Sequence, residues 1–231
     1  MRLFNSILNF IFPHSCVVCG TVGVDVCLKC LDKVRPYVVS KCVYCGEYTT
    51  NGETHASCKR KDGLNGLFIL FPYSPVVRAS VHAAKYRNVR GALTDLILSK
   101  GATHVLLNCK RVVTSSTLFV PIPLSGARHR LRGYNQATYI AEILTKLLGS
   151  SVDTSILKRK IDTKPQSRLK SGVDRISNVK GAFEVSKGVS YDSIVLVDDV
   201  WKTGSTIMEV CKELKHHAKC RVYALVLSGK V

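Results

Sequence analysis

The segment that decides the fold reads Ile194-Val-Leu-Val-Asp198-Asp199-Val-Trp-Lys-Thr203-Gly204-Ser205-Thr206. Its first four residues are apolar and mostly β-branched, which predicts a buried strand that ends at two adjacent carboxylates. A short loop follows, and residues 207–215 have the apolar spacing of a helix. A strand, a short loop and a helix in this order are typical of a parallel α/β sheet, where ligands bind outside the carboxyl ends of the strands.

The loop between this strand and helix is suited to an anion. A helix N-terminus offers free N–H groups and the positive end of the helix dipole, and Gly204 allows the backbone to approach closely. Thr203, Ser205 and Thr206 add hydroxyl donors. The paired carboxylates instead accept hydrogen bonds, as from a vicinal diol, so the segment indicates a sugar phosphate site. The alternative is a strand that ends in an Asp-rich turn.

The segment resembles the phosphoribosyl pyrophosphate (PRPP) motif of the type I phosphoribosyltransferases, in which a strand, an acidic pair and Thr-Gly-x-Thr occur in the same order. A Walker P-loop is excluded, because the chain contains no G-x-x-x-x-G-K-[ST] sequence.

Further strands and helices are expected to alternate along the chain. Apolar runs predict strands over residues 67–73, 118–122, 182–185 and 222–227. Helical spacing predicts helices over residues 75–87, 93–100 and 135–148, the first with Ser74 as N-cap and Pro75 at its first position. This alternation predicts an α/β fold with a parallel sheet.

Most of the ten cysteines lie in the first sixty residues and occur in pairs. The pairs are Cys16-x-x-Cys19, Cys27-x-x-Cys30, Cys42-x-x-Cys45 and the mixed pair His55-x-x-Cys58. Gly20 and Gly46 follow two of them, and a zinc knuckle needs such a glycine because its tight loop favours a positive φ. Four pairs supply two closed four-ligand sites, and closed zinc sites are structural.

The pairing of these ligands has two alternatives. A sequential arrangement joins the first two pairs in one site and the last two in the other, whereas a cross-brace interleaves them. The short loops within each site favour the sequential arrangement. The second site requires His55 in place of a thiolate, and the alternative is an exposed loop histidine. Zinc is expected rather than a disulfide framework, because no secretory signal is evident.

The charge of the chain indicates an anionic partner. Its 34 lysines and arginines against 16 acidic residues give a net charge of +18, which favours nucleic acid, a phosphorylated substrate or acidic lipid. The alternative is a solvated basic face. Tyr86, Tyr134 and Trp201 lie beside basic residues and could stack on bases, although a lone aromatic is more often part of the core.

Two regions are expected: residues 1–62, with an N-terminal apolar helix and the double zinc-binding module, and residues 63–231, with the phosphoribosyltransferase-like domain. The first twelve residues are apolar at helical spacing and lack a small-residue cleavage site. They predict a helix docked on the protein's own core, with membrane-surface contact as the alternative. No apolar run approaches the roughly 20 residues that span a bilayer.

Taken together, the ordered blocks resemble the ComF family of competence-associated proteins. The carriers are the cysteine pairs, Lys85-Tyr86-Arg87, Val120-Pro-Ile-Pro-Leu124, Leu131-Arg-Gly-Tyr-Asn-Gln-Ala137, Pro165-Gln166, Arg175, Asn178-Val-Lys-Gly-Ala-Phe183 and the Asp198-Asp199 block. The resemblance implies a zinc-finger module fused to a phosphoribosyltransferase-like domain. It also implies a cytoplasmic bacterial protein, linked to DNA uptake in natural transformation, that handles the incoming single strand with other DNA-uptake proteins.

The resemblance implies roles for particular residues. Asp198 and Asp199 would hold the ribose hydroxyls of PRPP, and Mg²⁺ would sit on its pyrophosphate and ribose diol. The 5′-phosphate would be cradled by Lys202, Thr203, Gly204, Ser205 and Thr206. The pyrophosphate would face the backbone of Pro121, Ile122, Pro123 and Leu124, with Arg128 assisting. Nucleic acid would be bound by Lys85, Arg87, Arg130 and Arg132. Two departures from the family pattern are Lys202, where Thr is common, and His55, where Cys is common.

Three functions remain open at this point. The first is a DNA-handling factor with a PRPP-binding domain, and the second is an active phosphoribosyltransferase with an unknown acceptor. The third is a PRPP-sensing adaptor without catalysis. No residue is assigned to catalysis. A phosphoribosyltransferase needs a base pocket, usually a hood above the motif; no separate hood sequence is evident, and the zinc-binding module could take that place.

Overall fold

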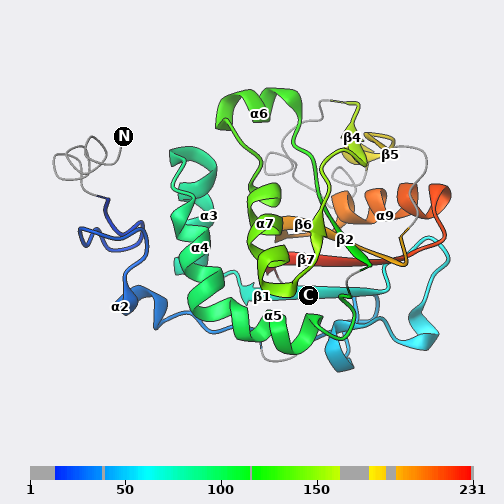
Figure 1. Ribbon diagram of the computed structural model, residues 1–231, viewed down its shortest axis with the longest axis horizontal. Helices are drawn as coiled ribbons and strands as arrows, with labels where there is room; N and C mark the ends of the chain where they lie inside the picture. The colour runs from blue at the N-terminus through cyan, green and yellow to red at the C-terminus, as the bar shows by residue number, and fades with distance from the viewer. Residues whose placement is uncertain (1–13, 38–39, 115, 162–176, 186–190, 230–231) are drawn as a thin grey trace.

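A computed structural model describes residues 14–37, 40–114, 116–161, 177–185 and 191–229. Its centre is a five-stranded sheet with the strand order β1-β7-β6-β2-β3 (Figure 1). These strands are β1 (Gly66–Pro72), β2 (Thr117–Pro121), β3 (Ser151–Val152), β6 (Ser193–Trp201) and β7 (Arg221–Gly229). All neighbours in this sheet pair in parallel, which confirms the predicted α/β class.

Helices connect the strands of the sheet. They are α3 (Pro75–Arg87), α4 (Gly91–Leu96), the π-helical η3 (Ile97–Gly101), α5 (Ala102–Cys109), α6 (Gly126–Arg132), α7 (Gln136–Leu148) and α9 (Ser205–His217). The helix expected over residues 93–100 is longer than predicted, because α4, η3 and α5 continue one another. Gly101 lies inside this helical segment, where an added Cβ would come within 3.0 Å of the Phe71 ring. Close packing therefore explains a glycine that otherwise indicates a helix end.

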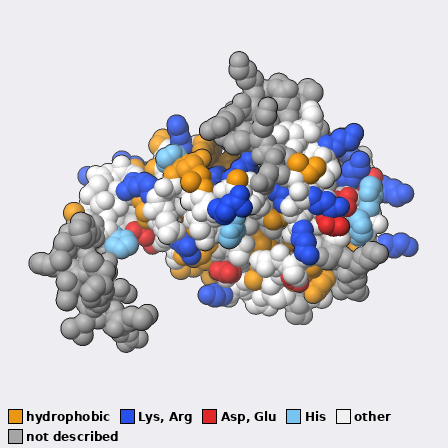
Figure 2. All heavy atoms as spheres, turned by 90° about the horizontal axis from the view of Figure 1, so that it is seen from above, with side chains coloured by type: hydrophobic (Ala, Val, Ile, Leu, Met, Phe, Trp, Pro, Cys, Tyr) orange, Lys and Arg blue, Asp and Glu red, His pale blue; other side chains and the backbone are white. Residues whose placement is uncertain are grey.

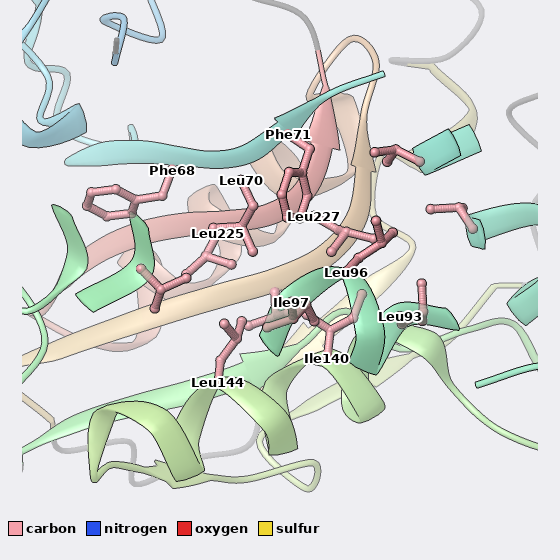
Figure 3. Close-up of a cluster of buried hydrophobic side chains, with 14 of the residues drawn as sticks. Phe68, Leu70, Phe71, Leu93, Leu96, Ile97, Ile140, Leu144, Leu225 and Leu227 are labelled. Carbon is pink, nitrogen blue, oxygen red and sulfur yellow. The ribbon is translucent and has the colours of Figure 1, made fainter. Parts of the chain in front are cut away.

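Both faces of the sheet are buried, as a parallel sheet requires. Figure 3 shows one face, where side chains of β1 and β7 meet those of α4, η3 and α7. Phe68, Leu70 and Leu225 belong to this cluster, whereas their neighbours Leu67, Ile69 and Val226 belong to the cluster on the other face. The second face is covered by α9 and by a small antiparallel sheet of β4 (Leu157–Arg159) and β5 (Phe183–Val185).

Strand β6 is longer than the sequence indicates. The ladder with β7 continues through Asp198↔Val226 to Trp201↔Gly229, so the two aspartates lie within the strand rather than after it. Successive side chains of a strand point to opposite faces. Asp198 and Asp199 therefore leave the backbone toward opposite faces of the sheet, although their side chains remain close enough to interact with each other.

The cysteine-rich segments lie at two ends of the sheet. The first, with α2 (Leu28–Leu31), lies beside α3 and α4, and the second, with η1 (Thr50–Gly52) and η2 (Ala56–Cys58), lies near the start of β1 (Figure 1). Cys16, Val26 and Leu31 share one hydrophobic cluster with α3 and α4. The first cysteine segment is thus packed into the core of the sheet domain. The division of the chain at residue 62 stays a prediction.

Some expectations fall on other parts of the chain. The helix expected over the first twelve residues lies outside the described residues, and so do Pro165-Gln166 and Arg175 of the family blocks. Within the described residues, no helix is both long and apolar enough to cross a membrane.

Candidate functional site

The structure brings the eight predicted metal ligands together as two sets of four. Cys16, Cys19, Cys27 and Cys30 form one set, and Cys42, Cys45, His55 and Cys58 form the other. Within each set the ligand atoms all lie within 4.8 Å of one another. The sequential pairing is therefore confirmed and the cross-brace is wrong. Four thiolates, or three with one imidazole, match the donor sets that structural zinc takes.

Both sites are built on the same short hairpin. In the first, the Cys16 N–H donates to the Thr21 carbonyl over 2.8 Å, and Gly20 turns the chain with a φ of 80°. In the second, the Cys42 N–H donates to the Glu47 carbonyl over 2.8 Å, and Gly46 has a φ of 74°. L side chains rarely adopt such a φ, so these glycines are required by the turn, as predicted.

His55 is oriented for metal binding. Its Nδ1 lies 3.4 Å from the Cys45 Sγ, and its Nε2 lies 2.9 Å from the carbonyl oxygen of Tyr48. A ring N–H that donates to a backbone carbonyl fixes the tautomer, and it leaves the other nitrogen free to coordinate. The histidine that departs from the family pattern thus completes a ligand set, and it is not an isolated loop residue.

One ligand of the first site, Cys19, is held toward the thiolate form that a metal needs. The Thr21 hydroxyl lies 3.2 Å from the Cys19 Sγ, and this hydrogen bond is the main cause that lowers the pKa of Cys19 to about 6. A lowered thiol pKa increases the fraction of thiolate at neutral pH and hence the metal affinity.

The acidic pair lies where α3 crosses the carboxyl end of β6. Asp199 is 8% exposed and forms an ion pair with Lys85 of α3. Asp198 accepts a hydrogen bond of 2.8 Å from the backbone N–H of Asp199. Desolvation by burial, followed by repulsion from Asp199, raises the pKa of Asp198 to about 7. Such a shift at the edge where ligands bind in this fold class is typical of a functional site.

Lys85 has a different position from the one expected for a nucleic-acid contact. Its side chain is 21% exposed and is directed to Asp199. No local pattern of residues indicates this pairing, because Lys85 and Asp199 lie on elements far apart in the chain. Lys85 therefore neutralises one carboxylate of the acidic pair.

The loop that contains Gly204 leads from β6 into α9 as predicted. Gly204 is the N-cap of α9 with a φ of 69°, and an added Cβ there would lie 2.3 Å from the ring of Trp201. The hydroxyls of Thr203 and Ser205 lie 3.1 Å apart at this helix start. Trp201 is 7% exposed beneath the loop, so it belongs to the core and offers no platform for a base.

The loop after β2 lies beside the end of β6. The Ile122 N–H donates to the Val197 carbonyl over 2.9 Å, and the Asn135 side chain donates to the Ile122 carbonyl over 2.9 Å. Ser125 then caps α6 by accepting the backbone N–H of Arg128. These bonds hold the segment Pro121–Leu124 beside the carboxyl end of β6, where the acidic pair lies.

A cleft of about 750 Å³ opens beside this loop. Pro123, Leu124, Arg130 and Arg159 are among its lining residues, together with Arg90. The guanidinium of Arg90 lies 4.0 Å from the centroid of the Tyr134 ring. All five of these residues thus belong to the predicted ligand loop or carry positive charge.

The predicted nucleic-acid residues do not form one cluster. Arg130 lines the cleft beside α6, whereas Arg87 lines a second cleft beside α3. Arg132 donates to the Gln136 side chain over 2.9 Å and lies 5.4 Å from the centroid of the Tyr86 ring.

Of the other two aromatics, only Tyr86 is available for stacking. Tyr134 is buried and its hydroxyl donates to the Ala84 carbonyl over 2.8 Å, while Tyr86 is 58% exposed.

The sequence does not indicate how the first zinc knuckle, residues 16–30, is attached to the sheet domain. The carboxylate of Asp95 in α4 accepts the Val26 N–H over 3.0 Å, and Gly91 leaves room for the side chain of Asp25. Nothing in the spacing of the chain marks these contacts, because they join residues about seventy positions apart.

Comparison with known proteins agrees with this site architecture. Residues 7–59 match the family model described as a double zinc ribbon domain. The chain is 30% identical to a DNA utilization protein YhgH of Salmonella typhi over 207 residues, which is 85% of this chain and 87% of the relative. The chain belongs to the ComF family. Within this family it is also 29% identical to Competence protein F of Haemophilus influenzae, over 90% of this chain and 93% of that protein.

Proposed function

We propose that this ComF family member handles single-stranded DNA in the cytoplasm during natural transformation, and that it binds PRPP or a related sugar phosphate. The observation that carries the ligand proposal is the acidic pair of β6 beside the Gly204 loop at the start of α9. The DNA proposal is supported by the net charge of +18 and by relatives named Competence protein F and DNA utilization protein YhgH.

The site residues divide into three groups under this proposal. Asp198 and Asp199 accept the ribose hydroxyls, and residues 202–206 donate to the 5′-phosphate. The backbone of residues 121–124 faces the pyrophosphate, with Arg128 nearby as a cation. The carboxylate oxygens at this edge are donors that suit Mg²⁺, which would neutralise the pyrophosphate when bound.

Without ligand, the Lys85–Asp199 ion pair occupies one carboxylate of the proposed site. A ribose that binds Asp199 must share or replace the ammonium of Lys85. The released ammonium would then lie near the anionic ligand, so the exchange keeps the charges paired.

The zinc sites have a structural role in this proposal. Each is a closed set of four ligands, with no position left for a substrate. The first site steadies α3, which carries Lys85 to the acidic pair.

A second candidate is an active phosphoribosyltransferase. The observation that favours it is the cleft beside Pro123 and Leu124, which offers room for an acceptor next to the proposed pyrophosphate position. Catalysis would consist of positioning the acceptor and stabilising the leaving pyrophosphate. Ligand binding without turnover would instead indicate a PRPP-sensing adaptor.

The test is fluorescence anisotropy of a labelled single-stranded oligonucleotide with zinc-loaded protein, at low and physiological salt, with and without PRPP and Mg²⁺. The proposal expects binding that persists at physiological salt and that PRPP alters. Asp199→Asn should remove the PRPP effect, while Glu213→Gln on the far end of α9 should leave it unchanged. Pyrophosphate release that depends on an added base would favour the enzyme, and a signal confined to low salt would exclude the DNA role.

A further inference from the structure

Helix α3 carries an exposed face without acidic residues. Its sequence, PVVRASVHAAKYR, contains four basic or histidine side chains and no carboxylate. Arg78, His82 and Tyr86 are exposed at intervals of four residues, so they form one stripe on the outer side of the helix. The stripe spans about 12 Å along the helix, at 1.5 Å per residue. Lys85 points instead toward Asp199, so the helix presents cations on two different sides.

This stripe borders a groove beside the first zinc knuckle. The groove has a volume of about 560 Å³ and is lined by Arg78, His82 and Arg87, by Tyr73 at the end of β1, and by Val17 of the knuckle. None of its lining residues is acidic. Figure 2, which looks down on the α3 and α6 side of the molecule, shows lysine and arginine side chains predominating over acidic ones on this face.

Aromatic rings accompany the cations of the stripe. Tyr73 is 46% exposed and Tyr86 is 58% exposed, in contrast to the buried Tyr134 and Trp201. The rings of His82 and Tyr86 lie 4.6 Å apart between centroids, and the Arg132 guanidinium lies 5.4 Å from the Tyr86 ring. The contacts on Tyr86 hold its ring in place while most of it stays accessible.

We infer that this groove, which we call the α3 groove, is a binding track for a single strand of nucleic acid. The inference rests on the proposed DNA-handling function and specifies the surface that performs it. Arg78 and Arg87 would pair with phosphates, and Tyr73 and Tyr86 would stack on bases. Exposed aromatic rings next to cations are the features by which proteins hold single strands, since unpaired bases offer their faces and duplex bases do not.

The charge part of the inference is tested with a matched pair of double variants. Arg78→Ala/Arg87→Ala removes two cations from the groove. Lys110→Ala/Arg111→Ala removes two exposed cations that follow α5 and do not line the groove. We expect the groove variant to bind an oligo-dT at least tenfold more weakly and to lower the slope of log affinity against log salt by about 1.4. The control variant should keep the wild-type slope.

The stacking part is tested with two ligands of equal charge. Wild-type protein should bind an oligo-dT about fivefold or more tightly than an abasic oligomer of the same length, because the abasic strand offers no bases to stack. Tyr73→Ala/Tyr86→Ala should abolish this preference, and Tyr73→Phe/Tyr86→Phe should keep it. Zinc content and circular dichroism of each variant verify the fold.

The outcomes separate this inference from the proposed function. If wild-type protein fails to bind single strands at physiological salt, both the DNA role and the α3 groove assignment fall. If wild-type protein binds and the groove variants behave like the Lys110/Arg111 control, DNA binding stands and the α3 groove is the wrong surface. Preference for duplex over single strand by the wild type would also overturn the groove assignment.

Discussion

The two zinc knuckles share one local structure and differ in the part of the sheet domain against which they pack. The first packs against α3 and α4, and its Val26 N–H donates to Asp95. The second lies at the start of the sheet, where the Thr54 N–H donates to the Asn65 carbonyl and the Tyr44 hydroxyl accepts the Leu64 N–H. The same hairpin therefore packs near the end of the sheet that carries the acidic pair in one case and near the opposite end in the other. Metal loss should have different consequences for the two.

The largest expected difference comes from removing one ligand of each site. Cys16→Ser should release one zinc ion and lower the stability by more than about 3 kcal/mol, because Cys16 is buried in the main core and structural zinc contributes directly to folding. Cys58→Ser, at a half-buried ligand, should also release one zinc ion but should leave PRPP binding intact. Zinc release assays, thermal unfolding and PRPP titration measure the contrast. Equal loss of PRPP binding in both variants would contradict it.

Asp198→Asn should increase the stability of the folded protein and abolish PRPP binding. This residue lies in the acidic pair, at the end of the sheet near the first knuckle. Its folded-state pKa of about 7 lies above the usual carboxyl value, so the folded state binds the proton more tightly than the unfolded state. Ionisation of Asp198 therefore lowers the free energy of unfolding. This cost is absent below about pH 4, grows as the pH rises to about 7 and is complete above about pH 7. The variant should therefore be more stable by about 2–4 kcal/mol at pH 8 and unchanged near pH 3.5.

The measurement for this variant is urea unfolding at the two pH values, together with PRPP titration. Binding should be lost although stability increases, as is typical of a functional site that is not optimised for stability. An unchanged stability at pH 8 would mean that the carboxylate of Asp198 is solvated in the folded protein.

Attachment of the two knuckles can be compared by deleting one acceptor from each. Asp95→Ala leaves the Val26 N–H without its partner, and Tyr44→Phe does the same to the Leu64 N–H. Each should destabilise the protein by about 1–3 kcal/mol. Only Asp95→Ala should also weaken PRPP binding, because it loosens the support of α3 and thus of Lys85. If Tyr44→Phe weakened PRPP binding equally, global stability rather than attachment would explain the effect.

The smallest effect is expected from His55→Cys, which makes the ligand set of the second knuckle equal to that of the first. Zinc should be retained and stability should change by less than about 1 kcal/mol, since a fourth thiolate replaces the imidazole. His55→Ala serves as the control and should lose the second zinc ion. Loss of zinc from His55→Cys would show that the hydrogen bond to the Tyr48 carbonyl is essential to the site.

Features that depend on neighbouring residues could be predicted from the sequence. The strand, loop and helix around Gly204 and the two sets of metal ligands follow from spacing over a few residues, and the structure confirms them. The continuation of β6 to Trp201 was missed because it depends on the β7 ladder. The Lys85–Asp199 pair was also missed, since it joins a helix and a strand more than a hundred residues apart. Such contacts are set by tertiary packing, which the local pattern of residues does not record.

The position of Trp201 has a practical consequence. It is the one tryptophan of the sequence, and its ring lies directly beneath the backbone of Gly204. Any ligand that shifts the loop around Gly204 must change the surroundings of this indole. The protein therefore carries its own optical reporter, and its ultraviolet emission can follow occupancy of the loop without a label.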